Sequence, residues 1–148
     1  MYDTLRKLRQ HRAELDNSEG GFTLIELLVV VVIIGILVAI AIPLYLHFEN
    51  GAKTSSAESD AHGLTNTVKL CQSDNGGVLP VDQSVATAGG TMTFTECPAD
   101  TFTLSAGNTA DYTTSAGDFT VAVHSESGKT ATYTSATGQT VVDDTPAP

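Results

Sequence analysis

The sequence predicts an α+β protein in which one long N-terminal helix packs on a small antiparallel sheet. An almost uninterrupted aliphatic run occupies residues 22–45, and an apolar stripe with helical spacing follows it directly. After residue 77 the chain is rich in threonine, with apolar residues at alternate positions, as in half-buried strands. Together these patterns divide the chain into segments 1–21, 22–45, 46–77 and 78–148.

Residues 1–19 are charged and polar and show no apolar periodicity, so the segment 1–21 is predicted to be a processed or cytoplasmic leader rather than part of a fold. Their charges cancel, since Arg6, Lys7, Arg9 and Arg12 balance Asp3, Glu14, Asp16 and Glu19. The formal net charge of −10 therefore belongs entirely to residues 22–148. A body this acidic repels polyanions, which argues against direct nucleic-acid binding.

Residues 22–45 are predicted to cross the cytoplasmic membrane once. About 24 residues at ~1.5 Å each reach ~36 Å, and the hydrocarbon core of a bilayer is ~30 Å thick. Several basic side chains precede this run, whereas the next one after it is Lys53. The positive-inside rule therefore places the N-terminus in the cytoplasm and exports the chain beyond Tyr45.

Glu26 is an acid inside the apolar run. An ionised carboxylate in hydrocarbon costs about 2.5–3.5 kcal/mol on insertion scales, so a residue of this kind is usually functional. Glu26 is therefore the first candidate functional residue of the chain.

Residues 46–77 are predicted to continue the helix beyond Pro43, because proline can kink a helix without ending it. One face of this continuation is apolar at steps of four and three: Ala57, Ala61, Leu64, Val68 and Cys71. The opposite, solvated face is assigned to Ser59, Asp60, Asn66 and Lys69. The stretch Asp74-Asn75-Gly76-Gly77 is expected to end the helix.

A single helix through both segments would contain about 50 residues and measure ~75 Å. No small globular domain needs a helix of that length, so the sequence favours an assembly in which neighbouring chains bury it. Glu49 and Lys53 are spaced to form an i,i+4 ion pair on its surface.

Cys71 and Cys97 both fall in the exported part, where a pair of cysteines favours a disulfide. Such a bond would close a loop of about 26 residues and stabilise the fold by ~3–4 kcal/mol in the loop-entropy model. The alternative is two buried thiols.

Residues 78–148 are predicted to form an antiparallel meander with one face on the helix and the other in solvent. Apolar residues alternate with threonine or other polar residues in the segments 91–95, 101–104, 119–123 and 131–133, and Val141 continues the pattern. The polar stretches 125–128 and 135–138 are expected to be hairpin loops, and residues 143–148 a loose tail.

The start of the apolar run resembles the processing and assembly signature of type IV pilins and of their relatives, the pseudopilins: Gly21-Phe22-Thr23-Leu24-Ile25-Glu26. The resemblance is close over residues 20–45, where it includes Gly35 and Pro43. It implies that a membrane prepilin peptidase cuts after Gly21 and that the new terminus, Phe22, is N-methylated. It also implies that the inner-membrane pilus machinery polymerises the mature chain with copies of itself.

The position of Glu26 agrees with that implication. Cleavage creates a cationic amine on Phe22, about one helical turn or ~6 Å away along the axis. Either the amine of a neighbouring subunit or the subunit's own amine can neutralise the carboxylate, and two charges costly in lipid then satisfy each other. The sequence leaves both pairings open.

The function expected from the resemblance is structural: a precursor of a surface-filament subunit used in adhesion, twitching motility or DNA uptake. The alternatives are a minor pilin, a pseudopilin of a type II secretion or competence machine, and a monomeric exported binding module on a membrane anchor. An ordinary signal peptide cut near Ala39-Ile40-Ala41, or a simple signal anchor, leaves Glu26 without a role.

No enzymatic activity, cofactor or metal is expected. His11, His47, His62 and His124 are scattered without metal-ligand spacing, and no nucleotide-binding or nucleophile motif is present. A calcium ion at Asp143 and Asp144 is the alternative to a solvated tail. O-linked sugars on the threonine-rich surface are the alternative to threonines that simply suit exposed strands.

Overall fold

The computed structural model describes residues 21–143 of the chain. The predicted leader before Gly21 and the predicted tail from Asp144 onward lie outside these residues. The chain divides into two compact units with a boundary between Leu44 and Tyr45. The second unit holds both sheets and the core.

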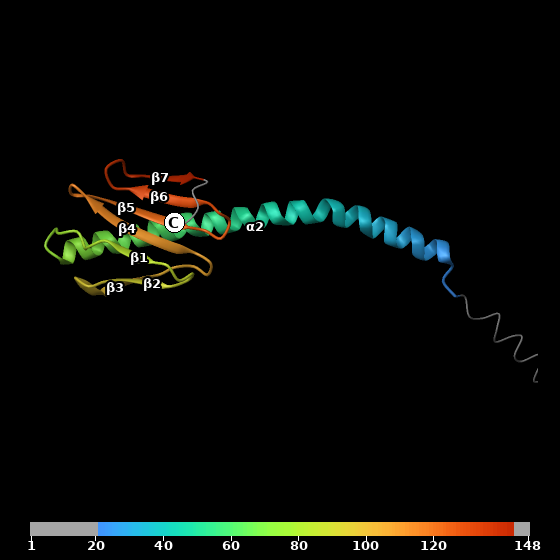
Figure 1. Ribbon diagram of the computed structural model, residues 1–148, viewed down its shortest axis with the longest axis horizontal. Coiled ribbons are helices and arrows are strands. Elements are labelled where there is room, and N and C mark those ends of the chain that lie inside the picture. Colours follow the sequence, from blue (N-terminus) through green and yellow to red (C-terminus); the bar gives the residue numbers. More distant parts are fainter. Residues whose placement is uncertain (1–20, 144–148) are drawn as a thin grey trace, which may run out of the picture. The chain divides into compact units, whose positions relative to one another are not determined.

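The long predicted helix is confirmed as α2, Leu24–Asp74, which contains Pro43 (Figure 1). Its predicted end is also confirmed. The amide of Asn75 donates to Cys71 O at 2.9 Å, and that of Gly77 donates to Gln72 O at 2.8 Å. Gly76 lies at φ 68°, in the left-handed region where glycine carries no Cβ penalty.

Within residues 45–143 the second unit contains seven strands: β1 (Gln83–Val85), β2 (Thr91–Phe94), β3 (Cys97–Thr103), β4 (Thr109–Ser115), β5 (Asp118–His124), β6 (Thr130–Thr134) and β7 (Gln139–Asp143). They form a five-stranded sheet in the order β1-β4-β5-β6-β7 and a separate pair, β2-β3. Every pairing is antiparallel. Figure 1 shows the β2–β3 pair lying apart from β5, β6 and β7.

The prediction of one meander is therefore correct for β5 to β7 and wrong for β2 and β3, which form their own sheet. Strands β1 and β4 were not predicted from the sequence. β1 has three residues, too few to show alternation, and β4 has only Ala110 and Tyr112 as apolar signals. The predicted loops 125–128 and 135–138 do connect β5 to β6 and β6 to β7. Asp143, assigned to a loose tail, is the last residue of β7.

The core of the second unit lies between α2 and the sheets. All five residues of the predicted helix stripe are at most 1 % exposed. Four aromatic rings cross the core in sequence, with centroid separations of 5.1, 6.0 and 5.8 Å: Phe94, Tyr112, Phe119 and Tyr133. These rings and the helix stripe belong to one hydrophobic cluster, so the amphipathic half of α2 is held by the sheets.

The predicted disulfide is confirmed. Cys71 and Cys97 are joined with their Cα atoms 5.5 Å apart, and both side chains are buried. The bond ties the last turn of α2 to the first residue of β3 and closes a loop that contains β1 and β2.

The assignment of Asp60 to a solvated face is wrong. Asp60 is 5 % exposed, and its carboxylate accepts hydrogen bonds from Ser105 N at 2.8 Å, Ser105 Oγ at 2.9 Å and Asn108 Nδ2 at 2.7 Å. The loop between β3 and β4 supplies all three donors and covers the acid. Helical periodicity reports apolar burial alone, so it does not detect a polar residue that a loop buries.

Candidate functional site

The candidate site is the start of α2, where Gly21, Phe22 and Glu26 lie. Phe22 is 88 % exposed, and every side chain in residues 24–44 is exposed in the single chain. Among the described residues, α2 is the helix that is long enough and apolar enough to cross a membrane. None of its most apolar stretch is buried. This unburied apolar surface needs a lipid or protein partner.

Glu26 is bonded to Thr23 in a reciprocal arrangement. The backbone amide and the hydroxyl of Thr23 both donate to Glu26 Oε2 at 2.8 Å, and the amide of Glu26 donates to Thr23 Oγ1 at 3.2 Å. This is a capping box, in which two side chains satisfy backbone donors that the first turn of a helix leaves free. The acid therefore stabilises the start of α2 within its own chain.

This role of Glu26 was not predicted from the sequence. The signal that would have found it is Thr23 three residues before Glu26 at the start of an apolar run, the Thr-x-x-Glu pattern of a capping box. Within residues 21–143 the bonds of the carboxylate are made through Oε2. Among these described residues none donates a hydrogen bond to the other oxygen, Oε1.

Gly35 and Pro43 lie farther along the same helix and do not contact Glu26. A Cβ built on Gly35 meets nothing within 4 Å, and the same holds for Gly21. The single chain thus gives no steric reason for glycine at either position. Any requirement for a small residue there must come from another protein.

A second polar cluster fastens the β5–β6 loop to α2. Lys53 Nζ lies 2.9 Å from Glu49 Oε1 and 3.4 Å from Glu126 Oε2, and Thr54 Oγ1 lies 3.3 Å from Ser127 Oγ. The hydrogen bond to Glu49, followed by the charge of that acid and by Glu126, raises the pKa of Lys53. The predicted Glu49–Lys53 pair is confirmed, and the longer-range partner Glu126 was missed.

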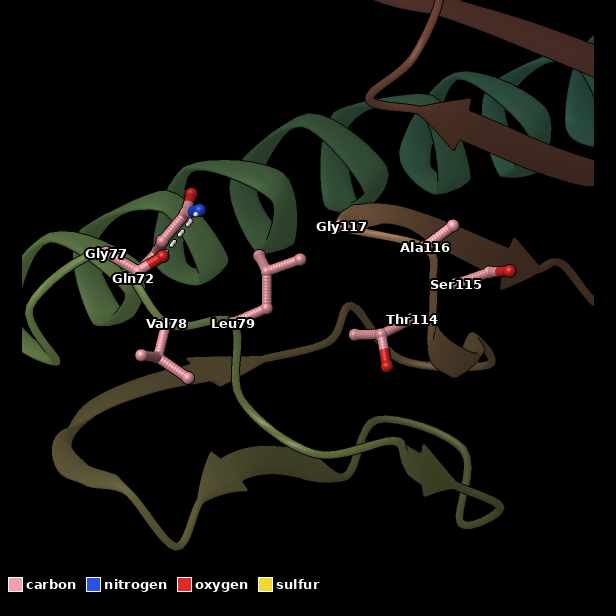
Figure 2. Close-up of a pocket in the computed structure, with 8 residues that line it drawn as sticks. All are labelled: Gln72, Gly77, Val78, Leu79, Thr114, Ser115, Ala116 and Gly117. Carbon is pink, nitrogen blue, oxygen red and sulfur yellow. Dashed lines mark hydrogen bonds between the residues drawn. The ribbon is translucent and has the colours of Figure 1, made fainter.

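Figure 2 shows an open cleft between the end of α2 and the β4–β5 hairpin. Its volume is about 320 Å³, and no charged side chain lines it: Gln72, Gly77, Val78, Leu79, Thr114, Ser115, Ala116 and Gly117. Gln72 Nε2 donates to Gly77 O at 3.2 Å, which closes the loop at the helix end. The lining contains no acid or base, so the cleft has none of the titratable groups that general acid–base catalysis uses.

One histidine makes a chain of hydrogen bonds across three strands. His124 lies 3.0 Å from Asp111 Oδ2 through Nε2 and 2.8 Å from Thr130 Oγ1 through Nδ1. Thr130 is 3 % exposed, so its hydroxyl is closed to a substrate and the arrangement serves to hold β4, β5 and β6 together. Within residues 21–143 no three His, Cys, Asp or Glu side chains form a group that could hold a metal ion.

Comparison with known proteins finds one family match and several relatives. The family described as prokaryotic N-terminal methylation motif matches residues 16–42. The type IV narrow pilus major component PilA5 of Thermus thermophilus is 36% identical over 101 residues, which are 59% of this chain and 87% of that protein. No solved structure matches the chain.

Two other relatives match over shorter stretches. The fimbrial protein EcpC of Eikenella corrodens is 43% identical over 72 residues, 49% of this chain and 46% of that protein. The type II secretion system core protein G of Pseudomonas aeruginosa is 39% identical over 58 residues, 39% of this chain and 41% of that protein. The chain thus spans less than half the length of these two relatives.

Proposed function

This chain belongs to the type IV pilin family, and on that premise we propose that it is the precursor of a structural subunit of a cell-surface filament. A prepilin peptidase cuts after Gly21, the new amine of Phe22 is methylated, and the mature chains polymerise through their N-terminal helices. The family match over residues 16–42 includes Gly21, Phe22 and Glu26, which supports this processing.

The observation that carries the proposal is the capped Glu26 at the head of an unburied apolar helix. Within residues 21–143 the hydrogen bonds from Thr23 go to Oε2, so a partner brought by assembly would bond the second oxygen, Oε1. A cationic amine on the Phe22 of an adjacent subunit is a suitable partner, because a charged donor and a carboxylate make a strong hydrogen bond in a dry environment. Side chains in residues 24–44 then pack between subunits instead of against lipid.

In this arrangement Glu26 sets the axial register between neighbouring helices of the filament. In hydrocarbon an unpaired carboxylate is unfavourable, and pairing removes that penalty at one axial stagger of neighbouring helices only. Before assembly, the hydrogen bonds with Thr23 hold the Glu26 side chain against the first turn of its own helix. Docking with a neighbour then adds a second bond without breaking the first.

We place the subunit in the cytoplasmic membrane before assembly, with its N-terminus inside, and in an extracellular filament afterwards. Its partners are copies of itself, the prepilin peptidase and methylase, and the inner-membrane pilus assembly machinery. The filament serves adhesion, twitching motility or DNA uptake. With a net charge of −10, a role in DNA uptake requires a separate component that binds the DNA.

The test is a pair of substitutions at Glu26. Glu26→Ala removes cap and charge, whereas Glu26→Gln keeps an amide oxygen that can cap Thr23 but cannot form an ion pair. Both variants are expected to insert and to be cleaved, and both are expected to lose most sheared filament on electron micrographs and immunoblots. Normal filament yield from Glu26→Ala would contradict the proposal, and filaments from Glu26→Gln alone would assign the role to capping rather than charge.

A second candidate function is a pseudopilin of a secretion machine, favoured by the similarity to the type II secretion system core protein G. Shearing cells and measuring the released material separates the two. Abundant fibres made mainly of this chain identify a major pilin, and trace amounts identify a minor pilin or pseudopilin. Full retention in the membrane as a monomer identifies an anchored binding module and contradicts both.

A further inference from the structure

Two aromatic side chains stand exposed where α2 enters the second unit. Tyr45 is 68 % exposed and Phe48 is 67 % exposed. Residues three apart lie on the same side of a helix, so the two rings form a short aromatic stripe. Neither ring belongs to the hydrophobic core cluster of the second unit.

The stripe begins where the apolar span has reached the thickness of a bilayer. Residues 24–44 of a continuous helix rise by ~32 Å, against a hydrocarbon core of ~30 Å. Tyr45 is the next residue, and Phe48 follows within one turn. Glu49 and Lys53, paired at 2.9 Å, come directly after Phe48 and are the first charged side chains beyond the span.

We propose that Tyr45 and Phe48 form an interfacial anchor that binds the boundary between acyl chains and headgroups on the outer side of a phospholipid bilayer before assembly. Tyrosine is enriched at this depth because its ring is apolar and its hydroxyl reaches water. Phe48 adds apolar area on the same side, and the Glu49–Lys53 pair holds charge just outside it. The anchor fixes the depth of the span in the membrane.

The bilayer is the occupant that the observations favour over a second copy of the chain. The stripe continues an apolar surface that spans a membrane, and it stops at the first ion pair, as a boundary with water requires. This inference rests on the membrane span of residues 24–44 and does not require polymerisation.

The chain contains no tryptophan, so single tryptophan substitutions report their own surroundings. The full-length chain is reconstituted as monomers in phosphatidylcholine nanodiscs carrying Tyr45→Trp or Phe48→Trp. Ile36→Trp is the deep reference, and Leu70→Trp is the aqueous reference, since both native residues are 59 % exposed. Quenching by lipids brominated near the headgroup, by lipids brominated near the chain end and by aqueous acrylamide is measured for each.

The expected result is that both anchor positions are quenched most by headgroup-proximal bromine and emit at shorter wavelength than Leu70→Trp. Acrylamide quenching at positions 45 and 48 equal to that at position 70 would overturn the inference while Ile36→Trp still reports a membrane span. Quenching of position 36 by acrylamide as strong as at position 70 would overturn both the anchor and the span. Protection at 45 and 48 that appears only when two copies share a nanodisc would assign the stripe to a second chain and overturn the lipid anchor.

Discussion

The hydroxyl of Tyr112 illustrates what one buried polar group contributes to this fold. Tyr112 is fully buried, and it donates to Pro80 O at 3.2 Å while its ring packs against Phe94. Burial, reinforced by the negative charges of Asp82 and Glu96, raises the pKa of Tyr112. The folded state therefore holds this group neutral at a pH where an unfolded chain would ionise it.

A raised pKa on Tyr112 makes stability depend on alkaline pH. Below the ordinary tyrosine pKa of about 10 both states are protonated, and the stability contributed by the neutral hydroxyl is fully present. Above it the unfolded state loses a proton first, so that stability falls as pH rises toward the folded-state pKa. Thermal unfolding of the full chain in detergent is expected to show a smaller alkaline loss of Tm for Tyr112→Phe than for the native chain.

The control is Tyr45→Phe, because Tyr45 is 68 % exposed. Its alkaline loss of Tm should equal that of the native chain. At neutral pH Tyr112→Phe is expected to cost about 0.5–1.5 kcal/mol, the value of one hydrogen bond. An alkaline profile for Tyr112→Phe identical to the native one would show that this hydroxyl does not control the transition.

At the scale of elements, the approach of β3 to α2 depends on Gly63. A Cβ at this position would clash with Cε2 of the Phe102 ring. The ring of Phe102 is half-buried and packs against the core cluster, so an alanine at position 63 would have to displace it. Gly51, in the same helix, has open space around it.

Gly63→Ala and Gly51→Ala are expected to change stability in opposite directions. Overpacking at Gly63 should cost about 1–3 kcal/mol, because Phe102 must leave its position. Gly51→Ala should add about 0.5–1 kcal/mol through helix propensity. The free energy of unfolding of both variants is measured by urea unfolding of the full chain in detergent. Equal stabilisation by both alanines would mean that Phe102 moves aside freely.

The sequence predicted helices and hairpins better than it predicted polar contacts, for physical reasons. Apolar spacing identified the buried stripe of α2 and strands β5 and β6 because burial selects apolar side chains at every turn or alternate residue. It missed the separation of β2 and β3, since alternation does not say which strand pairs with which. It also missed the burial of Asp60, whose partners Ser105 and Asn108 are remote in sequence.

At the scale of the whole molecule, the stabilising contacts of the fold are concentrated in one of the two units. Residues 21–44 contribute no side chain to the hydrophobic core cluster, whereas the second unit contains the core, the disulfide and the Asp60 cluster. The assignment of Gly21, Phe22 and Glu26 as the site came from a local motif and stays a prediction. What those residues bind could not come from one chain's contacts.

This division predicts that blocking the cut leaves the folded unit unchanged. Gly21→Val puts a branched side chain beside the scissile bond, where a peptidase cleft that accepts glycine has no room for it. The variant is expected to retain residues 1–21, seen as a larger mass, and to form no filaments because Phe22 never acquires a free amine. Its second unit should unfold at the native Tm, since a Cβ added at Gly21 meets nothing within 4 Å.

Gly35→Ala is the matched control, since its Cβ also meets nothing within 4 Å of the single chain. It lies inside the span and away from the cut, so cleavage should proceed as in the native chain. Mass spectrometry of membrane extracts shows for each variant whether the chain still carries residues 1–21. Normal cleavage of Gly21→Val would place the cut elsewhere and remove the Phe22 amine from the mechanism. Loss of cleavage with a lowered Tm would instead mean that the two units are coupled, and the independence of processing from folding would be wrong.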